Sequence, residues 1–181
     1  MTRTRDAHPF LVDVGWLQAN RGSRRQVALD GRLEGLELET SAVAVAGDEP
    51  VRFEGVLESL HEGILVTGTV RGRWRASCRR CLEPAEGELV VDVRELCVEE
   101  GDDETTYALG HEQLDLEPIV HDACILSLPL APLCREECLG LCPVCGANRN
   151  SDPCGCDASG GDPRWSALRL LAGGDDPSVQ G

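Results

Sequence analysis

The chain has no lysine and very few aromatic residues. All 17 of its basic residues are arginine, they face 32 acidic residues, and the formal net charge is −15. Aromatic residues make up only 3% of the sequence, so the core must be built from Leu, Val, Ile and Ala. This acidic balance argues against broad adhesion to nucleic acid and suits a basic protein partner at least as well.

Long apolar runs are also absent. No run of about eighteen apolar residues occurs, so we expect no membrane span and no membrane partner. Residues 1–16 contain no apolar stretch long enough for a signal peptide. We therefore expect a cytoplasmic chain whose ten cysteines stay reduced and bind metal, rather than forming disulfides.

The first hundred residues predict β-structure. Apolar residues alternate with polar ones, the pattern of strands with one solvated face, in four segments: residues 27–45, 51–57, 64–74 and 89–98. Glycine-containing breaks between these segments predict turns or bulges. Residues 10–14 predict a further short strand, followed by an Arg/Gly loop at residues 20–25. The expected arrangement is an antiparallel β-sheet or a partly open barrel.

Two helices are predicted in the second half. The first begins near Asp115, which is placed to cap it, and Pro118 is tolerated in its first turn. Helical spacing defines its apolar stripe: Leu116, Ile119, Val120, Ala123 and Leu126. The second helix is predicted from Asp162 to Gly173, with Pro163 in its first position.

The predicted fold class is therefore α+β, with a sheet, two helices and a C-terminal cysteine-rich zinc module. We expect residues 1–133 to form a β-rich domain with one helix. Residues 134–174 are expected to form the cysteine-rich module and the closing helix, and residues 175–181 a disordered tail.

Eight of the ten cysteines are candidate metal ligands. Cys78 and Cys81 form a C-x-x-C pair, which lets two thiolates reach one ion. Six more lie within 23 residues: Cys134, Cys138, Cys142, Cys145, Cys154 and Cys156. The CPVCG segment has the form of a zinc-knuckle turn, in which glycine permits a positive φ after the second ligand. Cys97 and Cys124 are predicted to be small core residues.

The number of thiols predicts one or two zinc ions. Tetrahedral zinc takes four ligands and structural sites are closed, so eight cysteines fit two sites. The pairing that we favour groups Cys142, Cys145, Cys154 and Cys156 in one site, and Cys78, Cys81, Cys134 and Cys138 in another that ties the sheet to the module. The alternatives are one zinc with spare thiols, a six-thiolate binuclear cluster, or an iron–sulfur cluster.

The sequence does not predict an enzyme, and no catalytic residue is assigned. A redox C-x-x-C usually opens a helix in a βαβ unit, whereas here one pair follows a strand and the other lies in a loop. The histidines are scattered and have no nucleophile pattern beside them: His8, His61, His111 and His121. A metal-dependent RNA-processing enzyme and a thiol redox sensor are the alternatives.

Arginine is concentrated in the first half of the chain. Residues 1–82 carry 12 Arg and 11 acidic residues, whereas residues 83–181 carry 5 Arg and 21 acidic residues. On a strand, Arg71, Arg73 and Arg75 point to one face, which would suit phosphate contacts unless they pair with the acids of the second half. The RNA-binding candidates are Arg71, Arg73, Arg75, Arg79, Arg80, Arg21, Arg24 and Arg25.

Several motifs resemble those of a known family. They occur in this order along the chain: FLVDVGWL, SCRRCLEP, LDLEPIVHDACILSLPLAPLC, CLGLCPVCGANRN, CGC and DPRWSALRLL. With these motifs the chain resembles the YceD family of bacterial and plastid proteins, associated with accumulation of large-subunit ribosomal RNA. The resemblance implies a role in ribosome biogenesis, through accumulation or processing of 23S rRNA. It also implies, as partner, 23S rRNA or a basic zinc-ribbon ribosomal protein of the large-subunit precursor, and no small-molecule substrate.

Overall fold

The computed structural model describes residues 9–33, 37–38, 43–45, 49–99 and 107–156. The helix predicted at residues 162–173 and the predicted tail lie outside these residues. The described part forms two compact units, one with residues up to Arg79 and Glu83–Arg135, the other with Arg80–Leu82 and residues from Glu136 onward. The elements are β1 (Leu11–Asp13), α1 (Gly15–Ala19), β2 (Arg24–Gly31), β3 (Glu37–Leu38), β4 (Val43–Val45), β5 (Val51–Ser59), β6 (Ile64–Ser77), β7 (Pro84–Val98), β8 (Tyr107–Ala108), β9 (Gln113–Asp115) and α2 (Glu117–Ser127).

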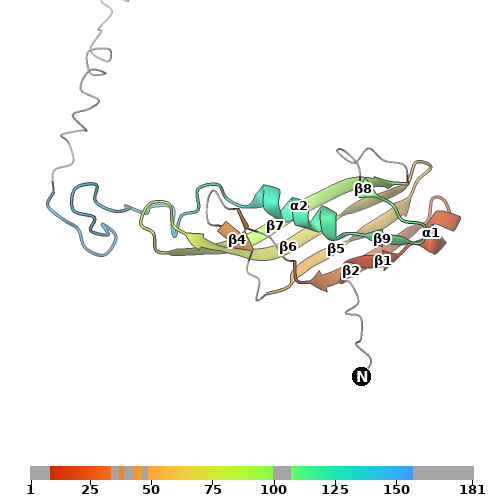
Figure 1. Ribbon diagram of the computed structural model, residues 1–181, viewed down its shortest axis with the longest axis horizontal. Coiled ribbons are helices and arrows are strands. Elements are labelled where there is room, and N and C mark those ends of the chain that lie inside the picture. Colours follow the sequence, from red (N-terminus) through yellow and green to blue (C-terminus); the bar gives the residue numbers. More distant parts are fainter. Residues whose placement is uncertain (1–8, 34–36, 39–42, 46–48, 100–106, 157–181) are drawn as a thin grey trace, which may run out of the picture. The chain divides into compact units, whose positions relative to one another are not determined.

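A mostly antiparallel sheet dominates the first unit (Figure 1). β2, β5, β6 and β7 are successive antiparallel neighbours, and β6 and β7 pair from Ile64 opposite Cys97 to Ser77 opposite Pro84. β4 pairs with the end of β6 on the same edge as β5, opposite β7, and β3 pairs with β4. β8 pairs with β7 in parallel. Among the described residues no pairing closes the sheet, so it is open. The predicted α+β class with an open antiparallel sheet is confirmed, and α2 confirms the first of the two predicted helices.

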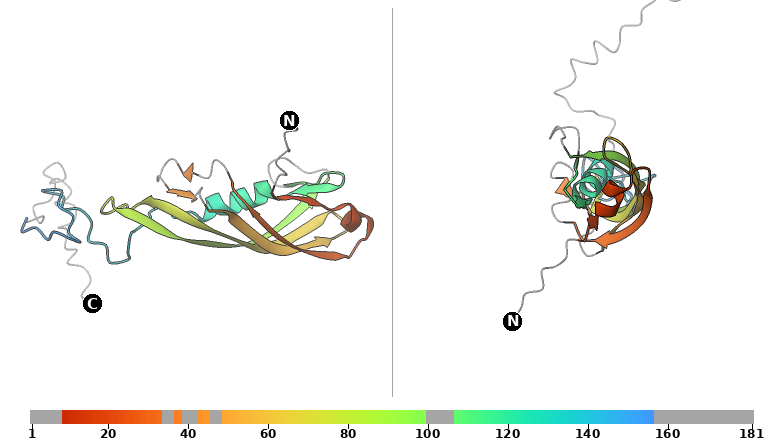
Figure 2. Two further views of the ribbon diagram at one scale, coloured as in Figure 1. Left: turned by 90° about the horizontal axis from the view of Figure 1, so that it is seen from below. Right: turned by 90° about the vertical axis from the view of Figure 1, so that its right-hand side faces the viewer.

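Helix α2 packs on one face of the sheet, which curves around it (Figure 2). Ile119, Val120 and Cys124 of the helix are buried in the same core as the sheet residues Phe53 and Val66. The N-cap of α2 is Leu116 and not the predicted Asp115. Asp115 stands one residue earlier, where its Oδ1 accepts the backbone N–H of Glu117 at 2.9 Å and so satisfies a donor of the first turn.

One member of the predicted apolar stripe is not buried. Leu126 is 85% exposed, although its spacing from Ile119 and Ala123 placed it in the stripe. The buried side of α2 is centred on Val120 and Cys124. At about 100° per residue, Leu126 lies about 200° around the helix from Cys124, so it points away from the core.

Helix α1 was not predicted. It has only five residues, which is too short for a helical period to be recognised in the sequence. Leu17 is its buried residue, and the side chain of Asn20 donates to Trp16 O at 2.8 Å where the helix ends. The N–H of Gly15 also donates to Asp13 Oδ1 at 3.1 Å, and the Gln18 side chain donates to Gly110 O at 3.0 Å. A buried leucine and several side-chain hydrogen bonds therefore order the segment between β1 and the Arg/Gly loop.

Two glycines let β5 and β6 approach closely around a buried aromatic ring. Gly55 lies opposite Gly68 in the register, and Phe53 is fully buried against them. A Cβ at Gly68 would lie 2.5 Å from Glu54 O and 2.7 Å from Phe53 Cε2. Both distances are below those that real Cβ atoms show, so this place in the sheet requires glycine.

Replacing Gly68 with alanine should therefore destabilise the sheet. We expect Gly68→Ala to lower the free energy of unfolding by about 1–3 kcal/mol, because the backbone or Phe53 must shift. Gly72→Ala in the same strand is the matched control, since a Cβ there meets only Val51 Cγ2, at 3.5 Å. Urea unfolding followed by far-UV circular dichroism measures both, and equal losses would contradict the close-approach argument.

Candidate metal centres

The second unit is held by tight turns. Leu141 and Asn148 form an isolated antiparallel bridge, and the N–H of Cys142 donates to Ala147 O at 2.8 Å. The N–H of Gly146 donates to Cys142 O at 2.9 Å, and Gly146 has φ +76°. The CPVCG segment therefore has the turn that its sequence indicates, with glycine in the left-handed region after the second cysteine.

Four cysteines of this unit form a compact group, the C-terminal tetrad: Cys142, Cys145, Cys154 and Cys156. Their sulfurs all lie within 4.8 Å of one another. Around a zinc ion with Zn–S bonds of about 2.3 Å, tetrahedral sulfurs lie about 3.8 Å apart. The donor set therefore fits a tetrahedral metal ion that prefers thiolate ligands.

The turn also prepares one of these sulfurs for metal binding. The backbone N–H groups of Cys145 and Val144 point at Cys142 Sγ, with the Val144 nitrogen 3.4 Å away, and they lower the pKa of the Cys142 thiol to about 6. Hydrogen bonds with Cys145 and Cys154 raise the pKa of Cys156 to about 12. Without metal the thiols of the tetrad are thus joined by hydrogen bonds, and a bound cation would displace their protons.

The other four candidate ligands form a second group, the hairpin tetrad: Cys78, Cys81, Cys134 and Cys138. Their sulfurs also lie within 4.8 Å of one another. Cys78 and Cys81 lie in the turn between β6 and β7, where the N–H of Cys78 donates to Glu83 O at 2.8 Å. In the same turn Leu82 has a positive φ of 64°. All four sulfur atoms are again thiols, so this group could hold the same kind of ion.

Two asparagines support the cysteine loop, and the sequence reasoning did not single them out. The Asn150 side-chain NH₂ donates to Cys138 Sγ at 3.3 Å and to Asn148 Oδ1 at 2.8 Å. Asn150 Oδ1 accepts the N–H of Leu139 at 2.9 Å. A donor to a ligand sulfur stabilises the thiolate and fixes its direction. The available signal was the N-x-N pattern directly after the knuckle turn.

Arg80 also holds the cysteine loop. Its Nη1 donates to Cys138 O at 3.0 Å, and its own carbonyl accepts the N–H of Leu141 at 2.9 Å. Gly140, with φ +71°, lies against Arg80, since a Cβ there would be 3.0 Å from Arg80 O. This guanidinium, a candidate for RNA binding, therefore contacts the backbone around a cysteine.

Most of the remaining arginine candidates contact other protein groups. Arg73 Nη1 lies 3.7 Å from Glu49 Oε1, and Arg73 Nη2 lies 3.6 Å from Glu86 Oε1. Arg75 Nη2 lies 3.6 Å from the same oxygen of Glu49. Arg24 pairs with Glu58 at 2.7 Å. Arg25 Nη1 donates to Asp13 O at 2.6 Å. Arg71, Arg73 and Arg75, the arginine stripe, do lie on the exposed face of β6. Acidic side chains from both halves of the chain lie among them.

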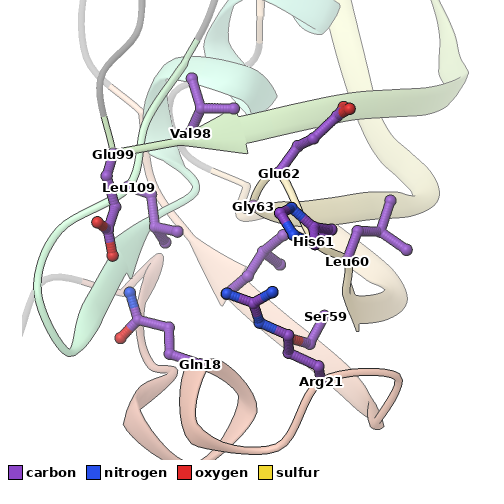
Figure 3. Close-up of a pocket in the computed structure, with 11 residues that line it drawn as sticks. Gln18, Arg21, Ser59, Leu60, His61, Glu62, Gly63, Val98, Glu99 and Leu109 are labelled. Atoms are coloured by element: carbon purple, nitrogen blue, oxygen red, sulfur yellow. The ribbon is translucent and has the colours of Figure 1, made fainter.

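Three candidates are placed differently. Arg71 is exposed, lies opposite Arg52 and Val90 in the register, and makes no ion pair within the described ranges. Arg79 is exposed in the β6–β7 turn. Arg21 lines a hollow of about 490 Å³ and points towards the β5–β6 turn that carries His61 and Glu62 (Figure 3).

The described histidines do not join either tetrad. His61 is in the β5–β6 turn, His111 precedes β9, and His121 Nδ1 lies 3.3 Å from Asp122 Oδ1 on the surface of α2. His8 lies outside the described residues. No helix in the described ranges combines the length and apolar character needed to cross a bilayer.

Comparison with known proteins identifies the family. The family model described as large ribosomal RNA subunit accumulation protein YceD matches residues 66–172, which include both tetrads. Uncharacterized proteins of Mycobacterium bovis and Mycobacterium tuberculosis (H37Rv) are each 35% identical over 186 residues, covering 97% of this chain and 87% of theirs. One of Mycobacterium leprae is 34% identical over 152 residues, covering 80% and 68%. No solved structure matches. The chain belongs to the YceD family.

Proposed function

We propose that the protein is a non-enzymatic zinc-binding factor that supports the accumulation or processing of 23S rRNA in the cytoplasm, and so the biogenesis of the large ribosomal subunit. The family match carries this proposal, because the family is named for accumulation of the large ribosomal RNA subunit. The match covers the residues of both cysteine tetrads.

Each tetrad is proposed to hold one zinc ion as a structural site. Two separate groups of four thiols support two ions, and four thiolates complete the coordination of zinc. A closed site leaves no position for a water or a substrate oxygen, which metal-dependent hydrolysis requires. A redox sensor requires exposed thiolates that oxidise reversibly while the fold survives. Oxidation of thiolates that hold a structural ion would release the ion and the order that it supplies. Two sets of four thiols therefore favour a structural role for the metal over a metal-dependent RNA-processing enzyme and over a thiol redox sensor.

The proposed direct partner is a basic protein of the large-subunit precursor. The acidic balance of the chain, −15 in total, supports attraction of a basic surface. The arginine stripe gives weaker support to RNA as the direct partner, because Arg73 and Arg75 already lie near Glu49. An RNA phosphate would have to displace the Glu49 carboxylate.

Metal content tests the two sites. The purified chain should contain about two zinc ions per molecule, measured by inductively coupled plasma mass spectrometry. Cys145→Ser and Cys81→Ser should each lower the content to about one, because each removes a ligand from a different tetrad. Cys97→Ala is the control and should keep both ions, since Cys97 is buried in the core. One ion in the unsubstituted chain would contradict the pairing.

Metal removal should separate the ligand thiols from the core thiols. When a strong chelator removes the metal, the tetrads should lose their order, because the energy of metal binding is also folding energy, and the hydrogen bonds that raise the pKa of Cys156 are lost with that order. Iodoacetamide at pH 8 should then modify all eight tetrad cysteines. Cys97 and Cys124 should stay unmodified, because burial raises the pKa of each thiol to about 12 and keeps it protonated. Mass spectrometry of peptides measures both groups. Protection of the tetrads with zinc gone would contradict the structural role.

Complementation tests the ribosomal role. Cells depleted of the protein should lose mature 23S rRNA relative to 16S rRNA, measured by Northern blotting, and the wild-type gene should restore it. Cys145→Ser combined with Cys81→Ser should fail to restore it, because both zinc sites are broken. The variant with Arg71→Gln, Arg73→Gln and Arg75→Gln should restore it.

The triple-Gln variant also separates RNA from protein as the direct partner. At every salt concentration of a series, the purified variant should retain as much 23S rRNA as the unsubstituted chain does. Lower retention with a flatter salt dependence would instead indicate phosphate contacts by these arginines. Unchanged 23S rRNA in depleted cells would contradict the proposed function itself.

A further inference from the structure

Much of one edge of β7 has no strand beside it. β6 pairs with β7 along its whole length, but on the other edge β8 pairs only with Cys97 and Val98. Within the part of the chain that the structure describes, residues 84–96 therefore form an open edge. Such an edge offers backbone N–H and C=O groups to another extended chain.

A groove lies between this edge and helix α2. Its volume is about 160 Å³, and Val93 and Ile119 are buried residues in its lining. Leu126 stands beside them on α2 with 85% of its surface exposed. The groove can therefore accept one apolar side chain, and burying Leu126 against it would remove apolar surface from water.

The rim of the groove is acidic. Glu95 and Asp122 line it on the side of the sheet that α2 covers. Asp122 Oδ2 accepts the hydroxyl of Tyr107 at 2.9 Å, which holds this carboxylate in place. Asp92 lies on the opposite face of β7, where its Oδ1 accepts the hydroxyl of Thr69 of β6 at 2.9 Å. Residues 84–96 carry four acidic side chains and one arginine. The groove thus combines an apolar floor with a negative border.

We propose that the β7 edge and this groove bind an extended basic segment of a partner protein by strand addition. The backbone of the segment would pair with residues 84–96, and its side chains would alternate between the two faces. An aliphatic side chain would enter the groove against Leu126, and Arg or Lys two residues away on the same face would meet Glu95 and Asp122. Basic side chains at the adjacent positions would point to the other face, where Asp92 lies. This inference rests on the proposed function only in expecting a basic ribosomal partner.

Charge distinguishes this occupant from two others. A second copy of the chain would bring a second acidic edge against the first, and like charges oppose such pairing. An RNA strand would bring phosphates to Asp92, Glu95 and Asp122, which repel them. A basic peptide is attracted to the same three carboxylates and also satisfies the backbone of the edge.

The experiment uses the full zinc-loaded chain and fluorescent octapeptides. Each library peptide carries one Val, Ile or Leu at a central position and Arg at the positions around it, so that basic side chains lie on both faces. Binding is measured by fluorescence anisotropy at about 0.1 M salt, where contact charges still act. Members of the library should bind, and the same peptides N-methylated at every second residue, in either register, should bind at least about tenfold more weakly in one register. Hydrogen exchange should slow at residues 84–96 on binding.

A matched pair of leucine variants tests the groove. Leu126→Arg should weaken peptide binding about tenfold or more, because it fills the groove with a like charge. Leu130→Arg should leave binding unchanged, since Leu130 is 76% exposed and does not line the groove. Both leucines are exposed, so neither change should alter the fold, which circular dichroism checks.

Four results would overturn the inference: no binding by any library member, equal binding by both N-methylated registers, equal effects of the two leucine variants, or slowed exchange confined to other residues. Dimerisation through this edge in sedimentation, or slowed exchange at residues 84–96 caused by an RNA oligonucleotide, would assign the edge to another occupant. If no peptide binds but depleted cells still lose 23S rRNA, only the docking site is contradicted. If peptides bind but depleted cells keep their 23S rRNA, only the proposed ribosomal role is contradicted.

Discussion

The antiparallel pairing of β6 with β7 is the interaction on which the rest of the first unit depends. One face of this pair supplies Val66, Val70, Leu89 and Val93 to the core against α2. Its turn carries Cys78 and Cys81, so the register of the hairpin also sets where two thiols lie. A slip of one residue would turn every side chain to the other face and would expose the apolar set. Core and cysteine placement therefore share one constraint.

The cysteines add a second kind of order, which comes from polar contacts. In the described part of the second unit Leu139 and Val144 are exposed, and short hydrogen bonds hold the loop, such as those of Asn150 with Cys138 Sγ and of Arg80 with Cys138 O. The Asn150 amide and the Val144 N–H place donors beside two of the cysteine sulfurs. A small segment of this kind gains most of its folding energy from the ion that it binds.

Alternation along the strands was readable from the sequence, because each strand buries one face and a period of two follows directly. The division of eight cysteines into two groups of four was predicted from the coordination number of zinc, and the sulfurs lie in those same two groups. Other features depend on contacts far apart in the chain. The meeting of Glu49 with Arg73 and Arg75 requires the strand register, and the exposure of Leu126 requires knowing which side of α2 faces the sheet. Helix α1 was too short to give a period.

The absence of lysine gives the open β7 edge an unusual form of protection. Many edge strands avoid stacking on their own kind by placing lysine there. Here acidic side chains, including Glu86, Glu88, Asp92 and Glu95, occupy the strand instead. Their mutual repulsion keeps two copies apart and is weakened by salt, whose screening length falls to about 3 Å at 1 M. Concentrated salt should therefore favour aggregation of the chain, and the choice of buffer becomes part of its colloidal behaviour.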